Sequence, residues 1–117
     1  MDWSFDEARP IYSQLIEQFT LAILSGELAP GERLPGVRDL ALTAAVNPNT
    51  MQKALSELER SGLLFTRRTA GRFVTEDVAL IEQIKAETAQ KKLHAFLEEM
   101  RRIGFSSKDL IHILTKE

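Results

Sequence analysis

The segment 47–54, with the sequence Asn-Pro-Asn-Thr-Met-Gln-Lys-Ala, carries the side chains best suited to binding chemistry in this chain of 117 residues. Asn47 is a favoured N-cap residue and Pro48 suits the first helical position, so a helix is predicted to start here. Amide, hydroxyl and ammonium groups then fall in its first turns. Because such groups at a helix N-terminus can hydrogen-bond base edges in the major groove of DNA, the segment predicts a DNA-reading helix.

This predicted helix has two distinct faces. At about 100° per residue its apolar side chains share one side and its polar side chains fall on the opposite side. The apolar positions are Met51, Ala54, Leu55 and Leu58, and the polar positions are Asn49, Gln52, Lys53, Ser56 and Arg60. Acids occur only at the margins of the polar face, at Glu57 and Glu59. An ordinary solvated helix face is the alternative interpretation, and the elements on either side favour DNA reading.

A shorter helix is predicted just before this one. The apolar residues of one face follow the spacing i, i+3, i+4, i+7, and they are Val37, Leu40, Ala41 and Ala44. Only a tight turn separates this helix from Asn47, which is the order of a helix-turn-helix. Arg38 lies on the shorter helix and is predicted to contact DNA phosphates, with an ion pair to Asp39 or another acid as the alternative.

A β-hairpin is predicted directly after the DNA-reading helix. Leu63–Arg67 and Arg72–Thr75 have the composition of strands, and Arg68–Gly71 has the composition of a turn. A two-stranded hairpin at this place is the wing of a winged helix. Its arginines are predicted to face the phosphate backbone or a minor groove. Charged edge-strand residues that discourage aggregation are the alternative interpretation of these arginines.

The predicted DNA-binding residues are Arg38, Asn47, Asn49, Thr50, Gln52, Lys53, Arg67, Arg68, Thr69, Gly71 and Arg72. Asn49 and Gln52 are predicted to read bases, because an amide can pair with adenine through two hydrogen bonds. The basic residues are predicted to supply affinity through phosphates. The formal net charge of −2 does not oppose this interpretation. Residues 33–75 hold seven basic and three acidic residues, which gives this segment a net charge of +4.

The N-terminal part is predicted to form another helix. Apolar residues at helical spacing indicate that it has Pro10 in its first turn and ends at Gly26. Trp3 and Phe5 precede this helix. Because two exposed aromatic side chains near a terminus are unfavourable, both are predicted to pack on the helix or on a partner chain.

The C-terminal part is predicted to form two helices. An apolar stripe begins at Val78 and is broken at Gly104, after which Ser106 or Ser107 can cap a final helix. Two such helices have little core of their own, so burial against a second copy predicts a two-fold dimer. The predicted interface residues are Ile81, Ile84, Leu93, Phe96, Leu97, Met100, Leu110, Ile113 and Leu114. A membrane-surface helix is the alternative, and acids near the stripe disfavour binding to anionic lipid.

Together these elements predict an α+β fold that is mostly α. A winged helix-turn-helix domain is expected over residues 1–75, followed by a short two-helix dimerisation tail over residues 76–117. A chain of this length buries roughly two-thirds of its unfolded surface, so it can form a core without disulfides.

Composition and motifs exclude several function classes. The chain has no cysteine, which removes disulfides, thiolate zinc sites and cysteine nucleophiles. No apolar run reaches the length of a membrane span and the N-terminus is acidic, so a cytoplasmic protein is expected. Without a nucleophile–base pair, a phosphate loop or a metal cluster, no catalytic residue, metal or cofactor is predicted. His94 and Glu98 lie one turn apart, but two ligands make a weak metal site.

The spaced residues of the first 74 positions resemble the N-terminal domain of the GntR family of bacterial transcription regulators. The matching residues are Pro10, Ile11, Tyr12, Gln14, Leu15, Gly26, Leu28, Pro30, Gly31, Leu34, Pro35, Arg38, Leu40, Ala41, Val46, Asn47, Pro48, Thr50, Lys53, Ala54, Leu58, Glu59, Gly62, Leu63, Gly71, Phe73 and Val74. The Asn-Pro-x-Thr element and the short two-helix tail are similar to the YtrA subfamily, and the resemblance then covers the whole chain.

The resemblance implies a winged helix-turn-helix homodimer that binds an inverted-repeat operator near its own operon, usually as a repressor. YtrA-like operons often include ABC transporter genes. By the same resemblance, Arg38, the start of the DNA-reading helix and the wing tip at 68–71 contact DNA. A small effector ligand between the tail and the DNA-binding domains is left open, because no group of residues marks such a pocket. A winged-helix module that binds protein, without sequence-specific DNA binding, is the alternative function.

Three residues depart from the family pattern. Gly36 stands where serine is common, so the shorter helix is expected to lack a side-chain cap. Ala45 stands at a corner often taken by glycine, where a left-handed backbone is expected to be strained. Thr69 replaces the first glycine of the usual wing turn, which predicts a bulkier wing tip.

Overall fold

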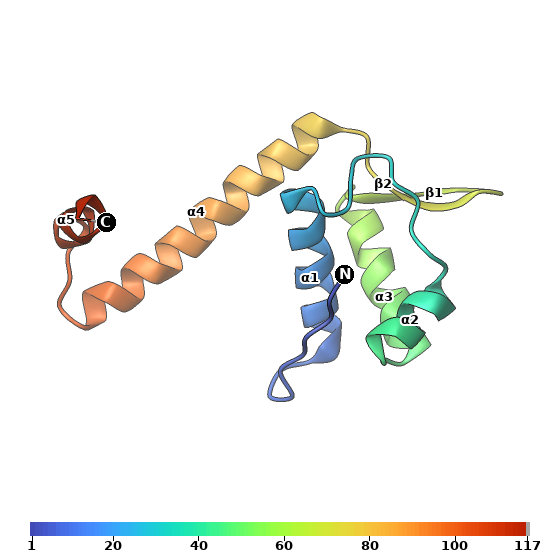
Figure 1. Ribbon diagram of the computed structural model, residues 1–117, viewed down its shortest axis with the longest axis horizontal. Coiled ribbons are helices and arrows are strands. Elements are labelled where there is room, and N and C mark those ends of the chain that lie inside the picture. The colour runs from blue at the N-terminus through green and yellow to red at the C-terminus, as the bar shows by residue number, and fades with distance from the viewer. Residues whose placement is uncertain (117) are drawn as a thin grey trace. The chain divides into compact units, whose positions relative to one another are not determined.

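The computed structural model describes residues 1–116, which form five helices and one two-stranded sheet (Figure 1). The elements are, in chain order, α1 (Ile11–Ser25), α2 (Val37–Ala44), α3 (Pro48–Arg60), β1 (Leu64–Arg67), β2 (Gly71–Val74), α4 (Val78–Arg102) and α5 (Ser107–Thr115). This arrangement confirms the predicted α+β, mostly α, class. The chain forms two compact units, Met1–Glu82 and Gln83–Glu117.

The first unit is built around α3, which contacts α1, α2 and β1. The apolar face predicted for α3 is its buried face, because Met51, Ala54, Leu55 and Leu58 are all buried. Phe19 of α1 is also fully buried in this core. Burying a side chain of this size contributes roughly 1.5–3 kcal/mol, so the apolar face fixes which side of α3 remains in solvent.

The N-terminal arm packs along α1. Trp3 meets Phe19 edge to face with ring centroids 5.1 Å apart, which confirms packing on the following helix. Gln14 is buried and ties the arm down, because its amide donates to the carbonyls of Asp6 (2.8 Å) and Arg9 (3.0 Å). The amide oxygen of Gln14 accepts the backbone N–H of Asp6 at 2.7 Å. These bonds satisfy both the amide nitrogen and the amide oxygen of this buried side chain.

The expectations for the two ends of α2 are confirmed. Gly36 precedes α2 and offers no side-chain hydrogen bond to it. Ala45 ends α2 with φ 56° and ψ 47°, and it is the one residue other than glycine within residues 1–116 that has a positive φ. The left-handed turn lets the chain change direction between α2 and α3, and a Cβ in this conformation is strained.

The wing is an antiparallel hairpin in which Leu64 pairs with Val74 and Thr66 pairs with Arg72. β1 begins one residue later than predicted, at Leu64. β2 is shifted by one residue and runs from Gly71 to Val74 instead of from Arg72 to Thr75. Leu63 lies outside β1 because its N–H instead bonds to the carbonyl of Leu58 and closes the end of α3 at 3.1 Å. Thr75 lies outside β2, and its hydroxyl accepts the N–H of Asp77 just before α4 starts.

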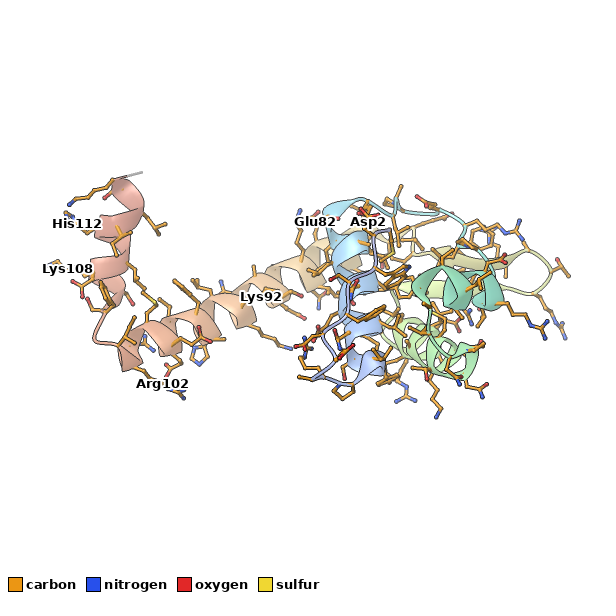
Figure 2. All side chains as sticks on the ribbon, turned by 60° about the horizontal axis from the view of Figure 1, so that its bottom comes forward. Asp2, Glu82, Lys92, Arg102, Lys108 and His112 are labelled. Carbon is orange, nitrogen blue, oxygen red and sulfur yellow. The ribbon has the colours of Figure 1, made fainter. Side chains whose placement is uncertain are left out.

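The second unit contains the rest of α4 and all of α5, which are separated by Gly104 with φ 93°. Ser106 caps α5 through a capping box with Asp109, so the first of the two predicted cap residues is the one used. Hydrogen bonds from the backbone and side chain of Ser106 lower the pKa of Asp109. Charged side chains such as Lys92 and Lys108 project from these helices (Figure 2).

None of the helices within residues 1–116 is long and apolar enough to cross a membrane. In the same residues, no three histidine or acidic side chains gather in a way that could hold a metal ion.

Candidate nucleic-acid interface

The start of α3 is fixed by Asn47. The side chain of Asn47 accepts the backbone N–H of Asn49 at 2.7 Å, and Pro48 occupies the first helical position. Because the oxygen of Asn47 is used by the helix itself, this residue contributes to the interface by fixing where α3 begins. Asn49 and Thr50 follow on the first turn, with Asn49 exposed and Thr50 half-buried.

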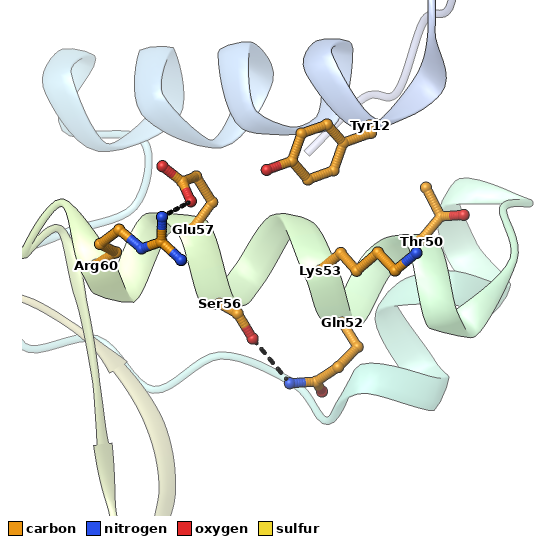
Figure 3. Close-up of a pocket in the computed structure, with 7 residues that line it drawn as sticks. All are labelled: Tyr12, Thr50, Gln52, Lys53, Ser56, Glu57 and Arg60. Carbon is orange, nitrogen blue, oxygen red and sulfur yellow. Dashed lines mark hydrogen bonds and ion pairs between the residues drawn. The ribbon is translucent and has the colours of Figure 1, made fainter.

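The polar face of α3 borders an open groove of about 550 Å³ next to α1. Its lining residues are Tyr12, Thr50, Gln52, Lys53, Ser56, Glu57 and Arg60, and Figure 3 shows them along one side of α3 with Tyr12 facing them from α1. The amide of Gln52 donates to the hydroxyl of Ser56 at 3.2 Å (Figure 3). This single bond holds the exposed amide while leaving its oxygen open to a ligand.

Three of the predicted cations are exposed and stand apart from the ion pairs of the described residues. Within residues 1–116, Arg38, Lys53 and Arg68 form no ion pair, so the alternative pairing of Arg38 with Asp39 is not observed. The three residues come from α2, α3 and the wing turn. Their full positive charge is therefore available to an anionic partner such as a phosphate backbone.

The other two wing arginines contact the protein itself. The guanidinium of Arg67 lies over the rings of Phe65 and Phe73, 5.6 and 5.5 Å from their centroids, and 3.9 Å from a carboxylate oxygen of Glu76. Arg72 pairs with Glu59 of α3, with 2.5 Å between its Nε and the Oε1 of the carboxylate. The sequence prediction placed Arg67 and Arg72 with the DNA-binding residues, and the structure gives both of them intramolecular partners.

The carboxylate of Glu59 is held in its charged form. Burial raises its pKa, but hydrogen bonds from Thr66 and Arg72 and the positive charge of Arg72 together bring the pKa below its usual value of 4.5. Glu59 is therefore ionised at neutral pH, and it loses the pair with Arg72 only as pH falls through this lowered pKa.

Sequence reasoning missed Arg33. Its guanidinium lies against the wing turn, with Nε 3.3 Å from where a Cβ on Gly71 would stand. Gly71 has φ 107°, so the absence of a side chain there serves both the turn and the close approach of Arg33. Arg33 belongs to the basic segment 33–75, but a loop residue with no helical or strand pattern gives no sign of where its side chain goes.

The predicted interface residues of the C-terminal helices occupy three kinds of position. Ile81 is buried within the first unit, and Leu110 is buried within the second. The half-buried residues are Ile84, Leu97 and Met100. The exposed residues are Leu93, Phe96, Ile113 and Leu114. Buried residues stabilise their own unit, so only the exposed and half-buried positions remain for contact with another chain.

The short α2, the tight turn at Ala45, the capped α3 and the two-stranded wing define a winged helix-turn-helix, the class of DNA-binding domain that the sequence predicted.

The comparisons with known proteins identify its family. The model of the bacterial regulatory proteins of the gntR family matches residues 11–74. The chain is 35% identical to the uncharacterised HTH-type transcriptional regulator YhcF of Bacillus subtilis over 95% of this chain and 92% of YhcF. It is 36% identical to the HTH-type transcriptional repressor YtrA of the same organism over 80% of this chain and 68% of YtrA. The chain therefore belongs to the GntR family and resembles YtrA, as predicted.

Two solved structures support the same assignment. A GntR family transcriptional regulator from Listeria monocytogenes is 34% identical, covers 97% of this chain and 99% of its own, and has a TM-score of 0.89. The DNA-binding domain of AraR, solved in complex with operator ORR3, is 27% identical over 64% of this chain and 90% of its own, with a TM-score of 0.55. The chain is a transcriptional regulator with a DNA-binding domain, and its family and relatives are regulators rather than enzymes.

Proposed function

We propose that this chain is a repressor that binds an inverted-repeat operator as a homodimer. The observation that carries the proposal is the polar face of α3, where the amide of Gln52 is exposed, together with three cations that form no ion pair within residues 1–116. These cations are Arg38 on α2, Lys53 on α3 and Arg68 on the wing. This face combines groups that can distinguish bases with groups that bind phosphates. Specific DNA recognition uses both, because phosphate contacts position the protein and base contacts select the sequence. Such a regulator acts where the chromosome lies, in the bacterial cytoplasm.

The repressor role and its target rest on the resemblance to YtrA, which is itself a transcriptional repressor. An operon with ABC transporter genes is the target that this resemblance favours. The AraR domain provides further support, because a related winged helix has been solved on its operator. In the proposed complex each protomer places α3 in one half-site, and the two half-sites lie about 34–36 Å apart.

The homodimer is supported by the apolar side chains of the second unit. Leu93 and Phe96 of α4 are about half exposed, and Leu114 of α5 is 67% exposed. Several large apolar side chains left in water on α4 and α5 favour burial against an equivalent surface.

The proposal is tested by titrating the DNA upstream of the gene for this chain, and a scrambled sequence of the same length, with wild-type protein and Gln52→Ala. We expect Gln52→Ala to lose about 1–3 kcal/mol on the operator, because one amide–adenine pair contributes about that much discrimination. Binding to scrambled DNA should hardly change. Gln90→Ala removes an exposed amide from α4 and serves as the matched control.

Two outcomes would contradict this proposal. Equal losses on both DNA sequences would show that Gln52 carries no sequence information. No retardation of any DNA by the wild-type chain at low salt would favour the alternative, a winged-helix module that binds protein. A reporter gene behind the same DNA distinguishes repression from activation, since deletion of a repressor raises its expression.

A further inference from the structure

We propose that Glu59, Thr66 and Arg72 form a latch that holds the wing against α3, so that Arg72 is a positioning residue rather than a phosphate contact. We call these three residues the wing latch. The proposal rests on the proposed function, because the latch matters for DNA binding only if the wing and α3 act on the same DNA.

The geometry joins three elements at one oxygen atom. Glu59 is next to the last residue of α3, and its Oε1 accepts the hydroxyl of Thr66 at 2.6 Å and the Nε of Arg72 at 2.5 Å. Thr66 on β1 and Arg72 on β2 are direct partners in the hairpin. One carboxylate of the helix therefore holds both strands at the same level.

The latch lies between the base and the tip of the hairpin, where it can restrict the orientation of the wing tip. Leu64 and Val74 are buried and anchor the base of the wing in the core. The latch lies two residues nearer to the tip, at the Thr66–Arg72 pair. On its outer side β2 is also held by the backbone of residues 31–34, with the N–H of Leu34 donating to the carbonyl of Arg72 at 2.9 Å. The latch adds the attachment that ties both strands to α3 at this level.

Arg72 is more buried than the other wing arginines. The side chain of Arg72 is 16% exposed and that of Glu59 is 31% exposed, so water screens their attraction only partly. The carboxylate neutralises the guanidinium at short range. Arg68, at the exposed wing turn, has no ion pair within residues 1–116 and keeps its charge for a phosphate.

For the removal of Glu59, the latch and simple electrostatics predict opposite changes in DNA affinity. Glu59 is an acid beside a surface proposed to bind DNA, so by charge alone its removal should strengthen binding. If Glu59 holds the wing in place, its removal should weaken binding instead. Glu57 provides the matched control on the same helix, because it pairs with Arg60 at 3.6 Å and has no hydrogen bond or ion pair to the wing within residues 1–116.

The first measurement is the affinity for operator DNA of Glu59→Ala, Arg72→Ala, the double variant and Glu57→Ala. We expect Glu57→Ala to bind slightly more tightly than the wild type and Glu59→Ala to bind about threefold or more weakly. In the double variant the two losses should not add, because either substitution alone already opens the latch. Tighter binding by Glu59→Ala would overturn the latch, and so would a loss from Arg72→Ala that is equally large with and without Glu59.

The second measurement needs no DNA. Hydrogen exchange in the free protein should speed up about tenfold at the amides of β1 and β2 in Glu59→Ala, and remain unchanged in Glu57→Ala. Unchanged exchange at the buried Leu55 and Leu58 in α3 would show that the core stays folded. Unaltered exchange in the wing of Glu59→Ala would overturn the latch even if DNA binding holds. Wild-type protein that binds no DNA would overturn the proposed function, while the exchange experiment would still decide on the latch.

Discussion

At the scale of single residues, identical side chains on one hairpin have different surroundings and therefore different expected roles. Arg68 lies at the exposed turn of the wing, whereas Arg72 is largely buried beside the carboxylate of Glu59. Composition alone gives both arginines the same charge and the same predicted role. Their partners give them different expected roles. A guanidinium that is already neutralised by a carboxylate at short range gains less binding free energy from a phosphate.

Arg68→Ala tests this distinction through salt dependence. Loss of one phosphate contact should reduce the slope of log affinity against log salt by about 0.9 and weaken binding to all sequences similarly. The control is Arg102→Ala, which removes the same charge from the exposed last turn of α4. An unchanged slope for Arg68→Ala would remove this residue from the phosphate contacts.

The site was predictable where its residues follow a local pattern. The cap at Asn47, the buried Met51 and the exposed Gln52 all follow from helix chemistry and a 3.6-residue period. The partner of Arg72 was not predictable, because Glu59 lies 13 residues earlier in the sequence and on another element. The approach of Arg33 to the wing turn depends on the folded path of a loop, which no periodicity encodes.

At the scale of elements, the ends of helices were more predictable from the sequence than the ends of strands. Helix ends carry chemical signals, so Pro48, Gly26 and the cap of α5 were predicted at the right places. Strand ends carry weaker signals. The N–H of Leu63 closes α3 instead of joining the hairpin, and this competition between two hydrogen-bond partners is decided by tertiary structure.

The turn between α2 and α3 gives a prediction about stability. Ala45→Gly should stabilise the protein by about 0.5–1 kcal/mol, because relief of a left-handed alanine (about 1–2 kcal/mol) exceeds the added backbone entropy of glycine (about 0.5–1 kcal/mol). Thermal unfolding should shift upward by a few degrees, on the order of 2–5 °C. Ala79→Gly makes the same substitution at an exposed helical position of α4 and should destabilise the protein. Destabilisation by Ala45→Gly would mean that its methyl group contributes more than the strain costs.

At the scale of the whole molecule, charge and apolar surface are segregated along the chain. The net charge of −2 conceals a basic segment at 33–75, where the proposed DNA-binding residues lie. The exposed apolar residues of the second unit, such as Phe96 and Leu114, carry the proposed dimer contact. Ile81 illustrates why sequence alone could not delimit that contact, because its place in the apolar stripe is the same whether it is buried in its own unit or against a partner.

The proposed dimer gives a prediction about the mass of the protein in solution, and binding to the full operator depends on this dimer. Wild-type protein at micromolar concentration should show by light scattering roughly twice the chain mass of 13.2 kDa. Phe96→Glu places a charge in the apolar surface and should yield the mass of one chain, because an unpaired buried charge is strongly unfavourable. Ala95→Glu adds the same charge at an exposed position on the opposite face of α4 and should remain a dimer.

DNA binding by the Phe96→Glu monomer then distinguishes the affinity of one protomer for a half-site from the contribution of dimerisation. A monomer engages one half-site at a time, so its affinity for the full inverted repeat should fall by about 10²–10⁴, the usual gain from linking two binding modules. Binding to a single half-site should match that of the wild-type protein, because residue 96 lies outside the unit that contains α3. A wild-type chain that is monomeric at micromolar concentration, or a Phe96→Glu variant that stays dimeric, would contradict the role proposed for this surface. In the first case two copies could meet only on the DNA, and the inverted repeat would then have to bring them together.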